Sequence, residues 1–259
     1  MTGTHAHEFL GLRGRTALVT GGSRGVGRAT ALLLARAGVD VGISYRSRSD
    51  EAEQVVREVT AFGVRGFAHG GDLTRPDVVA AFFDEGIARF GGIDFVIGNH
   101  GIWPPEDVSI AEMSAARWRR TLDVNLDSIF HLCQAAARHL EDDGRLVLVS
   151  STAGQRGEAF HGDYAASKGA MISLVKGLCV ELAPRGITVN SVAPGWIDTE
   201  MAHPAFEGEA RDRIARSIPI GRIATAEDVA GPIAFLCSRW GRHVTGEILN
   251  VNGGAVLVG

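Results

Sequence analysis

The chain has little cysteine and no long apolar stretch, and these absences exclude several kinds of protein. Its three cysteines in 259 residues are Cys133, Cys179 and Cys237. They fall in segments expected to be helical, without C-x-x-C spacing, so we expect buried free thiols and, by default, a reducing cytoplasm. No segment is long enough to span a bilayer, and the start lacks the basic and apolar runs of a signal peptide.

The sequence also lacks a concentration of charge of one sign. With 26 basic and 30 acidic residues the net charge is −4, and no basic cluster marks a nucleic-acid surface. His5 and His7 are more typical of a polar tail than of a metal site, and no metal is predicted. We therefore expect small molecules and copies of the chain as partners, and neither nucleic acid nor membrane.

Apolar runs and amphipathic segments alternate along the whole chain. The length suits one large domain over residues 1–259, and 45% hydrophobic with 22% charged residues is typical of a globular protein. This alternation predicts an α/β fold, a doubly wound parallel sheet with helices on both faces. The expected strands are Thr16–Thr20, Val39–Tyr45, Gly63–Gly70, Ile93–Gly98, Arg145–Ser150, Thr188–Ala193 and Ile248–Val251.

The first expected strand runs into a glycine-rich turn and a helix, in TALVTGGSRGVGRATALLLARAG. Gly21 permits a tight turn, Gly25 lets the backbone approach a diphosphate, and Gly27 lets the helix pack closely on the sheet. The amides that open the helix favour an anion. The strict G-x-G-x-x-G spacing is absent, so a purely structural turn is the alternative, but the context predicts dinucleotide binding.

Tyr164 and Lys168 stand four residues apart in YAASK, downstream of Ser151. Residues four apart share a helix face, so the ammonium should lie beside the phenol and lower its pKa from ~10. Tyr164 would then act as a general acid or base. Taken alone, the pair could equally be an ordinary exposed one.

Together these motifs resemble the short-chain dehydrogenase/reductase family, in family order and over about residues 10 to 255. Further segments match the family pattern, and they are GGDLT with Asp72 and Leu73, NHG at Asn99 to Gly101, DVNL with Asn125, VLVSS with Ser151, and VAPGWIDT from Val192 to Thr199. One departure is His100, where the family has a small residue, and it puts the packing near the cofactor ribose in question.

The resemblance implies a Rossmann fold with a seven-stranded parallel sheet and hydride transfer at a carbonyl or secondary alcohol. The implied catalytic residues are Asn125, which holds a water, Ser151, which binds the carbonyl oxygen, Tyr164, which moves the proton, and Lys168, which holds the nicotinamide ribose. The implied cofactor-binding residues are Gly21, Ser23, Arg24, Gly25, Val26, Gly27, Tyr45, Arg46, Ser47, Asp72, Leu73, Asn99, His100, Gly101, Tyr164, Lys168, Pro194, Gly195, Ile197 and Thr199.

The end of the second strand indicates which dinucleotide is bound. Enzymes that prefer NAD place a carboxylate there for the ribose 2′-hydroxyl. Here the strand ends in YRSR, and the nearest carboxylates lie too early, at Asp40, or in the next helix, at Asp50. Arg46 and Arg24 are able to bind a 2′-phosphate instead, so we expect NADP(H) to be preferred, with NAD(H) possible.

A segment of about residues 198–217 follows the last nicotinamide-side motif at the carboxyl end of a strand. We expect it to form a helical lid over the substrate, with a surface hairpin as the alternative. Trp103, Trp196, Phe160 and His161 flank the catalytic motifs and are candidates to line the pocket or to lie in the core or an interface.

The sequence leaves the substrate open. A ketoreductase using NADPH is favoured; a sugar or alcohol dehydrogenase and a 3-oxoacyl-carrier-protein reductase are the alternatives. A dinucleotide sensor has no need of four catalytic groups. Three carboxylates over residues 141–143, expected beside the site's mouth and balanced only by Arg185, argue against an acidic carrier protein. The apolar C-terminal VNGGAVLVG, by likeness to the family, favours a homotetramer over packing onto its own sheet.

Overall fold

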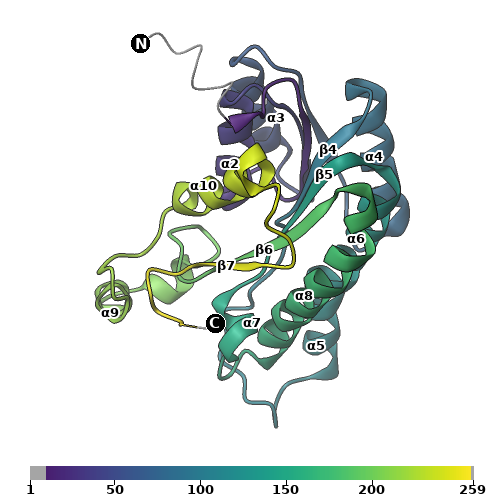
Figure 1. Cartoon of the computed structure of the whole chain (residues 1–259). Coiled ribbons are helices and arrows are strands. Elements are labelled where there is room, and N and C mark those ends of the chain that lie inside the picture. The colour runs from purple at the N-terminus through teal and green to yellow at the C-terminus, as the bar shows by residue number, and fades with distance from the viewer. Residues whose placement is uncertain (1–9, 258–259) are drawn as a thin grey trace.

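Seven strands in the order β3-β2-β1-β4-β5-β6-β7 form one parallel sheet, which confirms the predicted doubly wound α/β fold (Figure 1). The structure is a computed structural model and describes residues 10–257, so His5 and His7 lie outside the described residues. The strands are β1 (Thr16–Val19), β2 (Asp40–Tyr45), β3 (Gly66–Gly70), β4 (Ile93–Gly98), β5 (Leu140–Val149), β6 (Thr188–Pro194) and β7 (Ile248–Val251).

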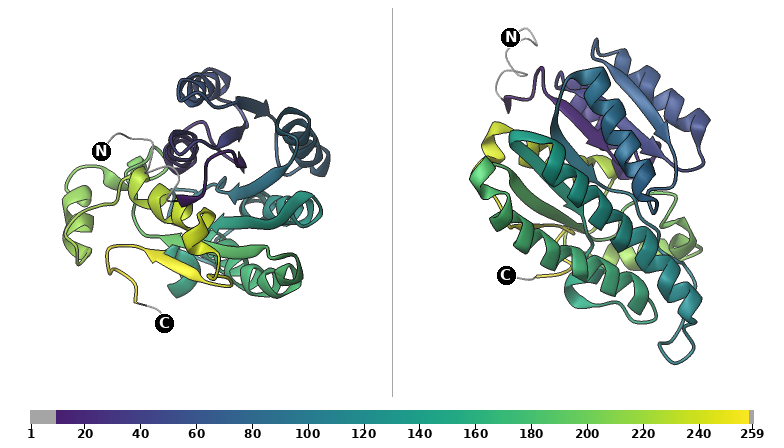
Figure 2. Two further views of the ribbon diagram at one scale, coloured as in Figure 1. Left: turned by 45° about the horizontal axis from the view of Figure 1, so that its top comes forward. Right: turned by 90° about the vertical axis from the view of Figure 1, so that its right-hand side faces the viewer.

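Helices cover both faces of this sheet (Figure 2). They are α2 (Gly25–Arg36), α3 (Ser49–Thr60), α4 (Pro76–Phe90), α5 (Ala115–Leu122), α6 (Ser128–His139), α7 (Thr152–Arg156), α8 (Gly162–Glu181), α9 (Ala210–Ser217) and α10 (Ala226–Cys237). Helices α2, α3 and α10 pack on one face, and α4, α6 and α8 pack on the other. None of the helices in the described part is long and apolar enough to cross a membrane.

The alternation of side chains along each strand builds two hydrophobic cores. In β1, Ala17 and Val19 join the core under α2 and α10, whereas Leu18 between them joins the core under α4 and α8. Successive side chains of a strand point to opposite faces, so a strand buried on both faces must be apolar throughout. This requirement explains why the buried part of the central strands, such as Ala17–Val19 and Leu146–Val149, is apolar in the sequence.

The strand order reverses between β1 and β4, and this reversal positions the site. β1 pairs with β2 on one side and with β4 on the other, so the chain leaves the carboxyl ends of β1 and β4 toward opposite halves of the sheet. In an open parallel sheet a crevice forms at this point, and ligands bind there. The connections after β1, β2, β4, β5 and β6 all lie at that edge.

Strand β5 begins earlier than the sequence predicts, at Leu140 rather than Arg145. Its pairing with β4 is irregular, because Ile93 pairs with Leu140 and the regular register resumes only at Phe95 and Arg145. The intervening Glu141, Asp142 and Asp143 are exposed. A bulge of this kind inserts unpaired residues into a strand, which alternating hydrophobicity does not reveal.

The acidic stretch therefore lies at the amino-terminal edge of the sheet, opposite the edge that carries Ser151. From Arg145 to Ser151 the chain advances roughly 20 Å at ~3.3 Å per residue. Arg185 is not free either, since its Nε donates to Asp142 Oδ1 at 2.8 Å. The expectation that Glu141, Asp142 and Asp143 flank the mouth of the active site is therefore wrong within one chain.

The cysteines follow the prediction in two cases out of three. Cys133 and Cys237 are buried free thiols, and burial raises the pKa of each to about 12. Cys179 is only half-buried on α8, so the prediction of burial is wrong there. Its helix presents one side to the sheet and the other outward, and Cys179 lies at the boundary.

Candidate active site

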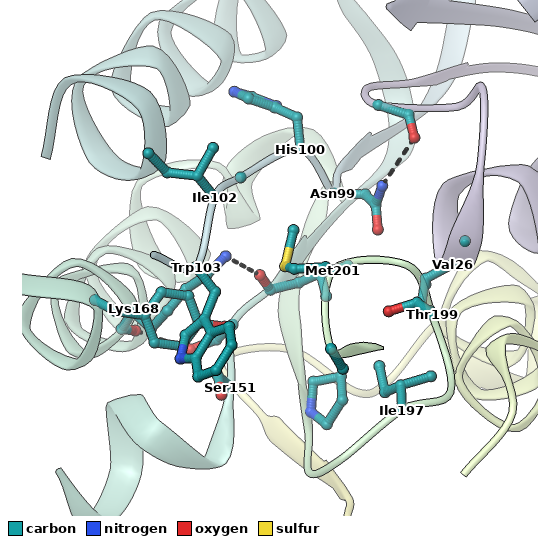
Figure 3. A pocket seen from close by; sticks show the side chains of 18 of the residues that line it. Val26, Asn99, His100, Ile102, Trp103, Ser151, Lys168, Ile197, Thr199 and Met201 are labelled. Atoms are coloured by element: carbon teal, nitrogen blue, oxygen red, sulfur yellow. Dashed lines mark hydrogen bonds between the residues drawn. The ribbon is translucent and has the colours of Figure 1, made fainter. Parts of the chain in front are cut away.

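A cavity of about 670 Å³ runs along the carboxyl ends of the strands, within the usual size range of ligand pockets. Among the catalytic and cofactor-binding residues predicted from the sequence, only Gly27 and Asn125 do not line it. Figure 3 shows Asn99, Val26 and Thr199 on one side of the cavity and Trp103, Ser151 and Lys168 on the other. Sequence reasoning thus located both ends of one continuous pocket.

The glycine turn has the geometry expected of a diphosphate cradle. Gly21 and Gly25 adopt positive φ angles of 63° and 52°, which other residues rarely do. A Cβ on Gly27 would lie 2.2 Å from the Gly21 carbonyl oxygen, so the close approach that Gly27 permits is between α2 and the turn itself. The Asn99 amide donates to the carbonyl oxygens of Thr20 at 3.0 Å and Gly21 at 3.3 Å and fixes the turn. These features fit a bound dinucleotide.

Arginines surround the far end of the cavity, together with a carboxylate that sequence reasoning missed. Burial works to raise the pKa of Asp72, but hydrogen bonds from Thr74 and the charge of Arg46, which follows β2, lower it below its ordinary value. Glu200, from the segment after β6, pairs with Arg24 and with Arg48, at 3.0 Å in the second case. A 2′-phosphate would meet three cations here, for which Asp72, Glu51 and Glu200 already compete.

His100, the departure from the family pattern, is accommodated by two hydroxyl groups. Its Nδ1 lies 2.8 Å from Thr20 Oγ1 and its Nε2 lies 2.6 Å from Ser128 Oγ. Burial, aided by the Lys168 ammonium, lowers the pKa of His100 to about 3, so the ring is neutral. One ring nitrogen then donates and the other accepts, which both hydroxyls allow. The imidazole joins β1 to the start of α6.

Ser151 and Tyr164 place two hydroxyl groups side by side at the near end. Ser151 begins α7, where its Oγ accepts from the Ala153 amide at 3.1 Å, and its hydroxyl also bonds that of Tyr164. Burial raises the pKa of Tyr164 to about 12; the Ser151 bond acts against this rise and Glu158 adds to it. The prediction of a lowered phenol pKa is wrong for the chain alone, because burial outweighs the effect of Ser151.

Lys168 lies one turn along α8 from Tyr164, but its ammonium does not reach the phenol oxygen. Its Nζ donates to the Val149 carbonyl oxygen at 2.8 Å and lies 5.9 Å from the centre of the Tyr164 ring. Burial lowers the pKa of Lys168 to about 8, so most of it is still cationic at neutral pH. The buried cation faces the cavity between the hydroxyl pair and His100.

Asn125 lies behind the cavity wall on a π-helical turn, Asp123–Asp127, between α5 and α6. The side chain is fully buried, its Oδ1 accepts from the Ile102 amide at 2.7 Å, and its Nδ2 donates to the Ile102 carbonyl oxygen at 2.9 Å and to Ser167 Oγ at 3.2 Å. These bonds fix the strand-end backbone that adjoins Lys168. The expected water-holding role stays a prediction.

Two of the four candidate aromatic residues line the cavity. Trp103 and Trp196 do so, edge to face at 5.9 Å between ring centres. His161 stacks behind Trp103 at 4.8 Å, and Phe160 is 55% exposed. Within the described chain, no group of three His, Cys, Asp or Glu side chains is placed to hold a metal ion.

Several lining residues were not predicted individually from the sequence, although Glu200 and Met201 fall in the expected lid, and they are Arg48, Arg156, Glu158, Glu200, Met201, Ile218, Ala255 and Val256. Except for Arg156, which ends α7, they belong to segments between the regular elements, where neither periodicity nor motif spacing constrains the side chains. The two C-terminal residues in this set show that part of the apolar tail contributes to the cavity wall.

A dinucleotide cradle at one end of the cavity and a hydroxyl pair beside a buried ammonium at the other define a nicotinamide-dependent oxidoreductase. Comparison with known proteins agrees. A family model described as enoyl-(acyl carrier protein) reductase matches residues 21–256. The chain belongs to the short-chain dehydrogenase/reductase family and is an NAD(P)-dependent enzyme acting on carbonyl or alcohol groups.

Similar proteins include reductases and solved structures with bound nucleotide. The 3-oxoacyl-(acyl-carrier-protein) reductase of Staphylococcus aureus is 37% identical over 94% of this chain and 98% of its own length. A short-chain dehydrogenase from Burkholderia cenocepacia in complex with NADP is 40% identical, with a TM-score of 0.88 over 94% of this chain and 98% of that one. A blue fluorescent protein from a metagenomic library in complex with NADPH is 36% identical, with a TM-score of 0.89 over 95% and 99%.

Proposed function

We propose that the protein is an NADPH-dependent ketoreductase that reduces a small free carbonyl compound to the secondary alcohol. The observation that carries this proposal is the hydroxyl pair of Ser151 and Tyr164, beside Lys168, at the end of the cavity that the glycine turn opens. When bound, the reduced nicotinamide supplies the hydride for the carbonyl carbon. Ser151 donates a hydrogen bond to the carbonyl oxygen, and Tyr164 gives that oxygen its proton.

The protonation state of Tyr164 suits this direction of reaction. A phenol whose pKa lies at about 12 keeps its proton throughout the neutral range, so Tyr164 starts in the proton-donating form, although the raised pKa makes it a weaker acid. Lys168 is the cation that would stabilise the phenolate once the proton has left, and it would also hold the ribose hydroxyls of the cofactor. Asn125 positions the backbone at Ile102 next to this cation.

The cofactor preference rests on the arginines at the far end of the cavity. The guanidinium groups of Arg46, Arg24 and Arg48 are able to form bidentate, charge-assisted hydrogen bonds with a phosphate. The ribose of NADH has no 2′-phosphate to accept these bonds. The carboxylate of Glu200 competes for two of them, and the 2′-phosphate carries more charge than it does. The named complexes of relatives with NADP and NADPH support the same preference.

The segment of residues 198–217 is a lid in this proposal. Thr199, Met201, Ala202 and Ser217 from it line the cavity, and a small apolar cluster around Phe206 and Ile218 supports it. Closure over bound ligands excludes water from the reacting groups. The proposal includes a cytoplasmic location, because the free thiols suit a reducing compartment. It also includes a homotetramer, by likeness to the family.

A second candidate is the reduction of a 3-oxoacyl chain on a carrier protein. It is favoured by the curated relatives that bear this name at 36% to 37% identity. The carboxylates at the start of β5 do not oppose it at the chain's own mouth, because they lie at the other edge of the sheet.

The proposal is tested by steady-state oxidation of NADPH with a panel of ketones. Tyr164→Phe should cut kcat by at least ~10² while NADPH binding stays near normal, because only the acidic proton is lost. Lys168→Ala should weaken NADPH binding as well. Lys176→Ala is the matched control, an exposed lysine on the same helix, and should leave both unchanged. Turnover above about a tenth of the parent in Tyr164→Phe would contradict the role of Tyr164.

A further inference from the structure

The near end of the cavity has a wall of aromatic rings held in fixed orientations. The Trp103 ring stacks on the His161 ring, with 4.8 Å between ring centres, and packs edge to face against the Trp196 ring. Trp196 in turn contacts Phe206 at 5.7 Å. Aromatic rings packed in this way offer a rigid apolar surface at little cost in conformational entropy. They suit a substrate with a flat or apolar body.

One carboxylate faces this wall. Glu158 lies in the connection between α7 and α8, lines the cavity and is half-buried. The Trp103 side chain donates a hydrogen bond to it. A carboxylate accepts about four hydrogen bonds, so most of the capacity of Glu158 is left for another donor. The other acidic residues that line the cavity in the described chain, Asp72 and Glu200, lie at the arginine end.

Glu158 does not assist the proton transfer and in fact opposes it. Its charge helps to raise the pKa of Tyr164, since it disfavours the phenolate that forms when the proton leaves. Burial raises the pKa of Glu158 itself, although His161, Trp103 and Arg156 favour its charged form. The charge of Glu158 therefore makes proton transfer from Tyr164 less favourable unless a group on the substrate offsets that charge.

We propose that Glu158 is a specificity-determining residue that selects ketones carrying a hydrogen-bond donor, a hydroxyl or an ammonium group, on the carbon next to the carbonyl. This inference rests on the proposed ketoreductase function. The donor binds the free oxygens of Glu158 while the apolar body of the substrate lies on Trp103 and Trp196. The same carboxylate repels substrates with an anionic group at that carbon. This role in substrate selection explains why the Glu158 carboxylate lies near Tyr164 although its charge disfavours the phenolate.

A matched set of phenyl ketones tests the proposal with NADPH. α-Hydroxyacetophenone and α-aminoacetophenone carry the two donors, propiophenone has a methyl group in their place, and benzoylformate has a carboxylate. The parent should prefer the better donor ketone over propiophenone by about 10-fold or more in kcat/KM, the range of a hydrogen bond to a charged group. Whichever donor ketone is preferred identifies the hydroxyl or the ammonium as the recognised group.

Glu158→Gln removes the charge and keeps the shape of the side chain. It should reduce the preference for donor ketones over propiophenone by about 5-fold or more and increase the relative rate with benzoylformate. Asp107→Asn is the matched control, because Asp107 lies 3.7 Å from His161 in the same neighbourhood but is exposed outside the cavity, and the ratios should not change. If Glu158→Gln does not fold, Glu158→Ala is measured instead, with the same expectation.

The outcomes separate this inference from the function on which it rests. Equal kcat/KM for the donor ketones and propiophenone, or a parallel fall for all four ketones in Glu158→Gln, would overturn the inference and leave the ketoreductase function standing. No reduction of any ketone by protein that still binds NADPH, seen by the fluorescence of the nucleotide, would overturn the proposed function and the inference together.

Discussion

Replacing Arg117 with alanine should destabilise the protein strongly, although Arg117 is not in the cavity. Asp163, the residue before Tyr164, is fully buried, and its Oδ2 accepts from Arg117 Nε at 3.2 Å and from Thr121 Oγ1 at 2.7 Å. Burial works to raise the pKa of Asp163, but these bonds outweigh it, and the pKa lies below its ordinary value. In Arg117→Ala the carboxylate keeps its burial and loses its cation.

The magnitude follows from the cost of breaking a buried ion pair, about 3–5 kcal/mol. Thr121 and the Tyr164 amide still bond Asp163 in the variant, so we expect the lower value, about 3 kcal/mol. For 259 residues the unfolding entropy is roughly 0.5 kcal/mol per kelvin, so Tm should fall by about 6 °C. Arg119→Ala, an exposed arginine on the same helix, is the control and should cost less than about 0.5 kcal/mol.

The loss should depend on pH and on the charge of Asp163. In the parent the folded-state pKa is depressed, so Asp163 contributes stability above the pKa of the unfolded state, ~3.9, which is lost as the pH falls through the folded pKa. In Arg117→Ala the folded pKa rises, so the deficit should be largest near neutral pH and shrink toward pH ~4.

Thermal unfolding of the parent, Arg117→Ala and the double variant Arg117→Ala with Asp163→Asn measures these effects. The double variant should be more stable than Arg117→Ala, because the amide carries no charge to leave unpaired. A Tm for Arg117→Ala within about 1 °C of the parent, or a double variant less stable than the single one, would show that the Arg117–Asp163 ion pair does not stabilise the folded protein.

Two further predictions concern ligands. NADPH should be used with a higher kcat/KM than NADH, and Arg46→Asp should reverse the preference by replacing a phosphate-binding cation with a carboxylate that accepts from the ribose hydroxyl; equal values for the two cofactors in the parent would refute this. Free ketones should be reduced with kcat/KM at least equal to that for a carrier-bound 3-oxoacyl chain at fixed salt. A tenfold preference for the carrier-bound chain, with rates that fall as salt rises, would establish the second candidate function instead.

Local sequence alone determined the fold class and most residues of the site. Apolar runs such as Ala17–Val19 and Phe95–Gly98 indicate burial on both faces, and their alternation with amphipathic segments favours a parallel sheet. Gly21, Gly25 and Gly27 act through their own backbone, so their spacing already carried the geometry of the turn. The four-residue spacing of Tyr164 and Lys168 likewise fixed a shared helix face.

Tertiary structure decided what depends on burial and on residues far apart in the chain. The pKa of Tyr164 follows from how deeply the phenol is buried and from Glu158, neither of which its own helix specifies. The pairing of Glu200 with Arg24 joins positions 176 residues apart, and the irregular register between β4 and β5 likewise depends on two separate strands. Desolvation and long-range contacts are properties of the packed molecule, so no local pattern in the sequence contained them.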